Sequence, residues 1–152
     1  FLNQFKGNKI AAVFVNWMMF GTSKLSCLDA SKAMLKQLTL RAHESLGEHK
    51  LGKPIIYLAN VQGFLEGPHL PFHRGDSKIV YSNGQEYSPE DPQITHDPLR
   101  INHYWYRSED YYRGEKKRKR LAFGDERSGK GEQDHLKACN YEEDKTILEL
   151  LK

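Results

Sequence analysis

The chain has 152 residues, of which 38% are hydrophobic and 28% are charged. A chain of this length buries about 70% of the surface that it exposes when unfolded, so residues 1–152 are expected to form a single domain with one core. The 23 basic residues against 20 acidic ones leave a net charge of +3, which is too small to require an anionic partner. No apolar run approaches the roughly 18 residues of a membrane span.

The amino-terminal part predicts a short helix and a buried strand. Residues 1–5, FLNQF, carry apolar side chains at helical spacing before a glycine that ends the helix. Residues 10–17, IAAVFVNW, are apolar without alternation, which is typical of a strand covered on both faces in a mixed sheet. Residues 27–46 have apolar residues at a spacing that fits a helix, but their conformation stays ambiguous.

Two further strands are predicted in the middle of the chain. Residues 53–61, KPIIYLANV, form an apolar run that begins near a proline, and residues 77–81 form a shorter one. Asn83 and Gly84 are a strong turn pair. Residues 87–98 hold three of the six prolines and predict a surface loop.

The carboxyl-terminal part predicts one more strand and two helices. Residues 100–106 read as an aromatic strand, and Ser108 is placed to cap a following helix whose first turn is acidic. Residues 124–131 are polar and rich in glycine, which predicts a flexible link before a final amphipathic helix over residues 140–151. Buried strands alternating with helices indicate an α/β fold.

Generic site motifs give little support for several functional classes. The sequence contains no GxGxxG, no Walker A loop and no GxSxG, so a nucleotide loop of these types and a serine hydrolase are not supported. His69 and His73 are four residues apart, but the intervening Pro71 argues against the helix that would place both imidazoles on one face. Two lone cysteines, Cys27 and Cys139, suggest reduced thiols and a cytoplasmic location.

Residues 101–120, INHYWYRSEDYYRGEKKRKR, allow two interpretations. Aromatic rings and a basic run could hold the bases and phosphates of a nucleic acid. However, successive strand residues face opposite sides, so Tyr104, Trp105 and Tyr106 cannot form one stacking platform. Acidic residues precede the basic run, which favours a solvated helix of mixed charge. We therefore expect no nucleic-acid partner, and peripheral contact with an anionic membrane or polysaccharide stays open.

Four segments resemble, in the same order, a group of GT-A-type glycosyltransferases. These are the family 92 enzymes and their bacterial family 2-like relatives. The matching segments are VFVNWMMFGTSK (13–24), GKPIIYLANV with GPH (52–61 and 67–69), the INHYWYRSEDYY stretch with its charged helix, and YEEDKTILELL (141–151). The resemblance implies a mixed-sheet, Rossmann-like fold of which this chain is the carboxyl-terminal, acceptor-side half.

The sequence departs from that group at two points. The relatives have an upstream nucleotide-binding half that ends in Asp-x-Asp, and no Asp-x-Asp occurs in the 152 residues. The resemblance therefore implies that the chain is a fragment that needs a missing amino-terminal half. Lys24 and Leu25 stand where relatives tend to carry Gly-His, so any role of that histidine is absent.

The resemblance also implies site residues. His103 is similar to a histidine that helps to hold Mn²⁺ or Mg²⁺, the ion that offsets charge on the diphosphate leaving group; the alternative is a buried histidine bonded to a backbone carbonyl. The expected substrate-binding residues are Trp17, Phe20, Gly21, Lys53, His69 and Arg107. Core positions for the first two, and solvated or unassigned roles for Lys53, His69 and Arg107, stay open.

The implied activity is that of a hexosyltransferase type of enzyme in polysaccharide biosynthesis. It would move a sugar from a nucleotide-sugar donor to a carbohydrate acceptor, with metal assistance and inversion. An inverting transfer needs a general base, usually a carboxylate, and the sequence does not choose among Asp29, Glu66 and Asp76. The alternative function is a non-catalytic module that binds carbohydrate or polyanion.

Overall fold

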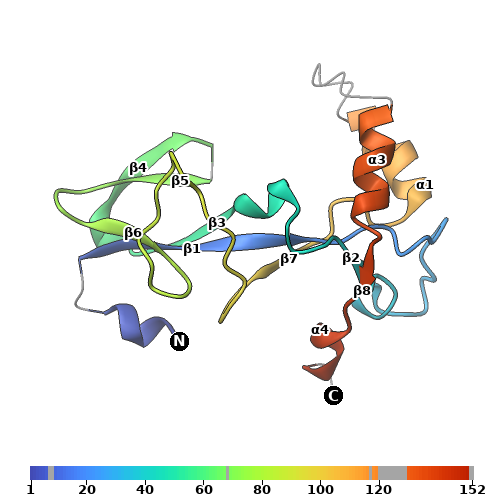
Figure 1. The fold of residues 1–152 in the computed structure, drawn as a ribbon, viewed down its shortest axis with the longest axis horizontal. Helices are drawn as coiled ribbons and strands as arrows, with labels where there is room; N and C mark the ends of the chain where they lie inside the picture. Colours follow the sequence, from blue (N-terminus) through green and yellow to red (C-terminus); the bar gives the residue numbers. More distant parts are fainter. Residues whose placement is uncertain (7–8, 68, 117, 120–129, 151–152) are drawn as a thin grey trace. The chain divides into compact units, whose positions relative to one another are not determined.

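The computed structural model describes residues 1–6, 9–67, 69–116, 118–119 and 130–150 (Figure 1). The chain divides into two compact units. Unit 1 comprises Phe1–Trp17 and Gly47–Ile101, and unit 2 comprises Met18–Leu46 and Asn102–Lys152. A mixed sheet and short helices confirm the predicted α/β class. None of the helices within the described ranges has the length and apolar character needed to cross a membrane.

Strand β1 (Ile10–Met19) confirms the predicted buried strand and extends it by two residues. All of its residues are buried. It pairs antiparallel with β3 (Gly52–Ile56) and parallel with β6 (Lys78–Tyr81). Strand β7 (Ile101–His103) also pairs with β1. This central position in a mixed sheet explains why the sequence of β1 shows no polar alternation.

Both faces of β1 are covered in unit 1. A register shift between Ile10 and Ala12 marks a bulge, which brings Ile10 onto the same face as Val13 and Val15. That face packs with Val80 and with the half-buried Phe5 of the 3₁₀ helix η1 (Leu2–Phe5). The opposite face of the sheet has its own cluster, formed by Ala12, Phe14, Ile79 and Tyr81.

The predicted strand at 53–61 is shorter than expected. After β3 the chain makes a 3₁₀ turn, η4 (Leu58–Asn60), and then enters β4 (Val61–Glu66). Strand β4 pairs antiparallel with β5 (Leu70–His73). The sequence analysis missed this hairpin because its connection contains Pro68, which lies outside the described residues, and because glycine and glutamate interrupt the apolar pattern.

The predicted strand and turn near residue 80 are confirmed. Strand β6 begins one residue later than expected. At the turn, Gly84 has a φ of 88° and its N–H donates to the carbonyl of Tyr81 at 2.9 Å. Residues without a Cβ adopt this left-handed conformation without strain, which accounts for the Asn-Gly pair.

The predicted helix over residues 140–151 is wrong. Its first half contains β8 (Glu142–Glu143), which pairs antiparallel with β2 (Leu40–Arg41), and among its described residues only α4 (Thr146–Glu149) is helical. Arg41 contacts the carboxylates of Glu142 and Asp144. The Arg41 side chain is 13% exposed. This paired charge and the strand pairing override the helical spacing of the apolar residues.

Residues 27–46 do not form the helix that their spacing allows. The described structure has one 3₁₀ turn there, η2 (Met34–Lys36), followed by β2. Leu38 and Ala42 are buried. A further 3₁₀ turn, η3 (Gly47–Lys50), belongs to unit 1.

The capped helix predicted after residue 100 is present, but the strand predicted over residues 100–106 is shorter, because it ends at His103 and Tyr104, Trp105 and Tyr106 lie outside it. Strand β7 is followed by α1 (Glu109–Tyr111), whose cap is Ser108, with Oγ accepting from the N–H of Tyr111 at 3.3 Å. A π-helical turn, η5 (Tyr112–Lys116), continues from α1.

The expected flexible link at 124–131 falls largely outside the described residues. Residues 124–129 are not described, whereas residues 130 and 131 begin helix α3 (Lys130–Ala138). Sequence analysis missed α3 because its mean hydropathy is low and its apolar residues are few.

Candidate functional site

Three of the predicted substrate-binding residues meet in unit 1. Lys53 lies in β3, Trp17 lies in β1, and His69 precedes β5. The Nζ atom of Lys53 is 3.2 Å from Nε2 of His69. The rings of Trp17 and His69 are 5.6 Å apart and meet edge to face at 76°. We call this group the Lys53–His69–Trp17 cluster.

The tautomer of His69 follows from the partner of Nδ1, the ring nitrogen that does not contact Lys53. Nδ1 is 3.0 Å from the carbonyl oxygen of Gly52. A carbonyl oxygen only accepts, so Nδ1 carries the hydrogen, and Nε2 of the neutral ring has a lone pair that accepts from Lys53. The Lys53 ammonium group is thereby held by a neutral partner.

Gly52 allows this arrangement because it has no side chain. A Cβ atom there would lie 2.2 Å from the carbonyl oxygen of Val15 and 2.8 Å from the Phe14 ring. The close approach of β3 to β1 fixes the carbonyl of Gly52, and the carbonyl in turn orients His69. Glycine is therefore required at a position that sequence analysis did not select.

Polar side chains of unit 1 hold the loop of residues 87–98. Asn16 donates to the backbone carbonyls of His49, at 2.8 Å, and Gln93, at 3.0 Å. The ring of His96 lies 2.9 Å from the carbonyl of Trp17 through Nε2. Sequence analysis missed Asn16 and His96. The available signal was a lone asparagine within the apolar run of residues 10–17, and the structure shows that this asparagine is fully buried and therefore needs hydrogen-bond partners.

Trp17 is 9% exposed. A ring covered to this extent supports His69 through its edge contact and offers little face to a sugar. This placement favours the core interpretation of Trp17 over a wall for an acceptor.

Phe20 and Gly21 lie in unit 2 and are also buried. The Phe20 ring is 4.8 Å from that of Tyr104. A Cβ on Gly21 would lie 2.4 Å from Oδ1 of Asn140 and 2.6 Å from the carbonyl of Cys139. Their placement favours roles in packing unit 2.

His103 and Arg107 lie among aromatic rings in unit 2. The His103 ring stacks on Trp105 at 5.6 Å and 25°, and Nζ of Lys116 lies 3.2 Å from the centre of the Trp105 ring. The Arg107 guanidinium lies 4.6 Å from the centre of the Tyr111 ring. These contacts are cation–π and stacking interactions between residues close in sequence.

The described residues do not supply a complete metal site. Among them, no group of three or more histidine, cysteine, aspartate and glutamate side chains is arranged to hold an ion. His103 offers one imidazole, and an Mn²⁺ or Mg²⁺ site needs carboxylate ligands in addition. We therefore derive no chemical step through a metal from these residues.

No general base emerges from the carboxylates considered. Hydrogen bonds from the side chain and backbone of Ser31 lower the pKa of Asp29, and a hydrogen bond from Lys9 lowers that of Asp76. A lowered pKa favours the carboxylate form but makes it a weaker base. The side chain of Glu66 lies outside the described part of the chain.

Comparisons with known proteins identify no relative, so the proposed function has to be argued from the geometry of the two groups of side chains. The cluster in unit 1 combines a cation with a histidine of fixed tautomer, and the stack in unit 2 surrounds His103 with aromatic rings. No protein-family model, curated protein or solved structure matches the chain.

Proposed function

We propose that this chain is the acceptor-binding part of a GT-A-type glycosyltransferase, which transfers a sugar from a nucleotide-sugar donor to a carbohydrate acceptor. The observation that carries the proposal is the Lys53–His69–Trp17 cluster. Its members come from three separate segments that the resemblance marks as substrate-binding, and their side chains meet in unit 1.

The chemistry of the cluster suits a polar acceptor. In the proposed reaction an acceptor hydroxyl oxygen forms a bond to the anomeric carbon of the donor, while the bond from that carbon to the diphosphate breaks. The hydroxyl proton passes to a base that remains unassigned. Lys53 holds and orients hydroxyl or anionic groups of the acceptor, and His69 fixes the Lys53 ammonium group. A donor held in this way binds such groups without further ordering.

In the proposed enzyme the donor is held by the carboxylates of an Asp-x-Asp element, which these 152 residues do not contain. His103 is proposed to join carboxylates of that other part around Mn²⁺ or Mg²⁺. The mixed sheet around β1 is compatible with the acceptor side of a GT-A fold.

Calorimetric titration tests the proposal directly. We expect residues 1–152 to show no measurable binding of uridine or guanosine diphosphate with Mn²⁺, and to bind an acceptor saccharide. Micromolar binding of nucleoside diphosphate by this chain alone would contradict the division into donor and acceptor parts.

A second test uses the longer polypeptide that carries the donor-binding part. His103→Ala there should abolish transfer that depends on Mn²⁺ while leaving the thermal midpoint little changed. Saccharide binding without any transfer by that longer polypeptide would instead favour the non-catalytic module.

A further inference from the structure

Lys53 carries a charge that the described structure does not neutralise. Lys53 is half-buried, and its Nζ atom contacts the neutral ring of His69. Among the described residues, no carboxylate forms an ion pair with Lys53. A cation that is partly removed from water is stabilised by an anionic partner, and here that partner is absent from the described chain.

The hydrogen-bonding capacity of Lys53 is only partly used. An ammonium group has three donors, and one of them points to Nε2 of His69. The ring cannot turn away, because Nδ1 is bound to the carbonyl of Gly52 and its edge meets Trp17. The remaining donors of Lys53 are thus oriented and free to bind a ligand.

We propose that Lys53 and His69 form a subsite for an anionic group on the acceptor sugar, either the carboxylate of a uronic acid or a phosphate ester. This deepens the proposed function and rests on it for the identity of the ligand as a sugar. Lys53 binds the anion directly, and His69 is a positioning residue that holds the ammonium group. The Lys53 ammonium group can hydrogen-bond to a neutral hydroxyl, but it attracts an anionic group by charge as well, so the subsite selects anionic over neutral sugars.

The test is a set of NMR titrations of residues 1–152. The probes are inorganic phosphate and three monosaccharides (glucose, galactose and mannose), each as the neutral methyl glycoside, the uronate and the 6-phosphate. At least one anionic form should bind about tenfold more tightly than its neutral parent, because the ammonium group attracts it by charge in addition to the hydrogen bond. The signals of the His69 ring should shift in the same titration.

Variants assign the preference to the two residues. Lys53→Met should reduce the ratio of anionic to neutral affinity to about one, and Lys53→Arg should retain it. Lys50→Met is the matched control, because Lys50 is an exposed lysine on η3 of the same unit. His69→Asn keeps a donor for the Gly52 carbonyl but, being shorter, places no acceptor at the position of Nε2, so it should lower the ratio of anionic to neutral affinity.

The outcomes separate the subsite from the proposed function. Equal affinity for neutral and anionic forms in every set, or a preference that survives Lys53→Met, overturns the subsite alone. If inorganic phosphate binds at Lys53 as tightly as any sugar phosphate and no neutral sugar binds, the anion subsite stands and the acceptor role falls. Absence of binding by every probe overturns both.

Discussion

The cluster in unit 1 and the aromatic stack in unit 2 hold their cations in different ways. In unit 1, Lys53 and His69 are 16 residues apart and Lys53 contacts a neutral ring nitrogen. In unit 2, Lys116 lies on the face of Trp105 and also donates to its carbonyl. The stack uses its cation internally, whereas the cluster leaves donors of its cation available. Binding capacity therefore depends on what a charged side chain already contacts, and the number of charges alone does not reveal it.

The largest losses of stability are expected from two glycine substitutions that disturb close backbone contacts, one in each unit. Gly52→Ala places a methyl group 2.2 Å from the Val15 carbonyl, and Gly21→Ala places one 2.4 Å from Oδ1 of Asn140. Each change forces backbone or side-chain movement and should lower the free energy of unfolding by about 2–4 kcal/mol. Urea denaturation measures the loss, and hydrogen exchange shows which unit opens.

The control for both glycine variants is Gly63→Ala, since a Cβ there meets nothing within 4 Å. It should change the free energy of unfolding by less than about 1 kcal/mol. Gly52→Ala should also abolish selection of anionic sugars, and Gly21→Ala should preserve it in the folded fraction. Loss of selection in both variants would mean that the cluster does not depend on Gly52 specifically.

The second effect concerns the ion pairs between β2 and the segment after β8. Nε of Arg41 is 2.9 Å from Oδ2 of Asp144, whose side chain is 6% exposed. Asp144→Ala should cost about 2 kcal/mol, because it leaves a largely buried guanidinium with fewer anionic partners. Glu142 still neutralises part of that charge. Urea denaturation again gives the measurement.

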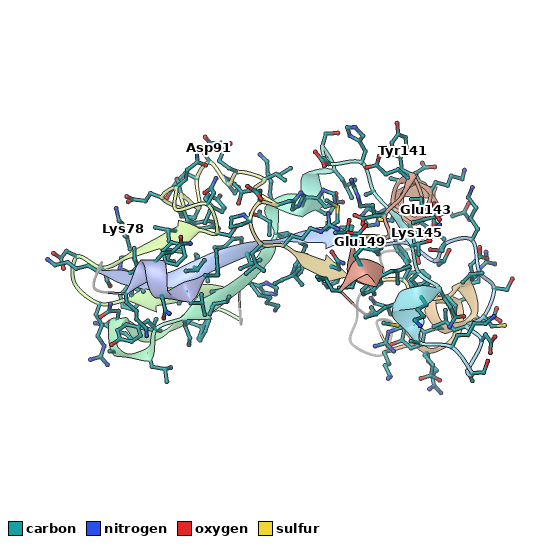
Figure 2. The ribbon with its side chains drawn as sticks, turned by 90° about the horizontal axis from the view of Figure 1, so that it is seen from below. Lys78, Asp91, Tyr141, Glu143, Lys145 and Glu149 are labelled. Atoms are coloured by element: carbon teal, nitrogen blue, oxygen red, sulfur yellow. The ribbon has the colours of Figure 1, made fainter. Side chains whose placement is uncertain are left out.

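Glu143→Ala is the matched control for Asp144→Ala. Glu143 pairs with Lys145 at 2.7 Å, but both side chains are more than half exposed, at 55% and 58%. Figure 2 shows these two residues on the carboxyl-terminal segment of unit 2. An exposed pair contributes about 0–1 kcal/mol. Equal losses for the two variants would show that burial does not decide the strength of these pairs.

The third prediction concerns the aromatic stack in unit 2, where Lys116 lies over the Trp105 ring. Lys116→Met removes the cation over Trp105 and should cost about 1 kcal/mol, with a change in Trp105 fluorescence. Lys119→Met is the control, because Lys119 is 65% exposed and lies 3.8 Å from Glu115. Fluorescence of a Trp17→Phe background isolates the signal of Trp105. An unaltered Trp105 spectrum in Lys116→Met would contradict the cation–π contact.

The sequence predicted those parts of the fold whose causes are local or compositional. The apolar run of β1, the Asn83-Gly84 turn and the Ser108 cap each carry their own signal, and all three are present. The helix expected over residues 140–151 failed for the opposite reason. Its residues pair with β2, and a partner a hundred residues away leaves no trace in a local pattern.

The candidate site shows the same limit. Resemblance selected Lys53 and His69, but the fixed tautomer of His69 depends on the carbonyl of Gly52. That carbonyl is placed by close packing of two strands, which residue types alone do not reveal. Conversely, Phe20 was a plausible sugar-binding residue by type, and its complete burial could be known only from the packing of unit 2.

The smallest expected effect concerns the contact between Tyr81 and the loop of residues 87–98 in unit 1. The hydroxyl of Tyr81 accepts from the N–H of Gln93 at 2.6 Å, and burial raises the pKa of Tyr81 above its ordinary value, with a further rise from the charge of Asp91. Asp91, labelled in Figure 2, lies two residues before Gln93 in the sequence. The folded state therefore favours the neutral phenol more than the unfolded state does. Its contribution to stability is fully present below about pH 10 and is lost as the pH rises further.

Tyr81→Phe should cost about 0.5–1 kcal/mol at pH 7, through loss of the acceptor for Gln93. Because phenylalanine does not ionise, this difference should shrink as the pH is raised from 8 to 11. Tyr141→Phe, at a side chain 65% exposed, controls for the loss of one tyrosine. Urea denaturation across this pH range makes the measurement, and a difference that stays constant for Tyr81→Phe would show that burial of its hydroxyl does not couple to folding.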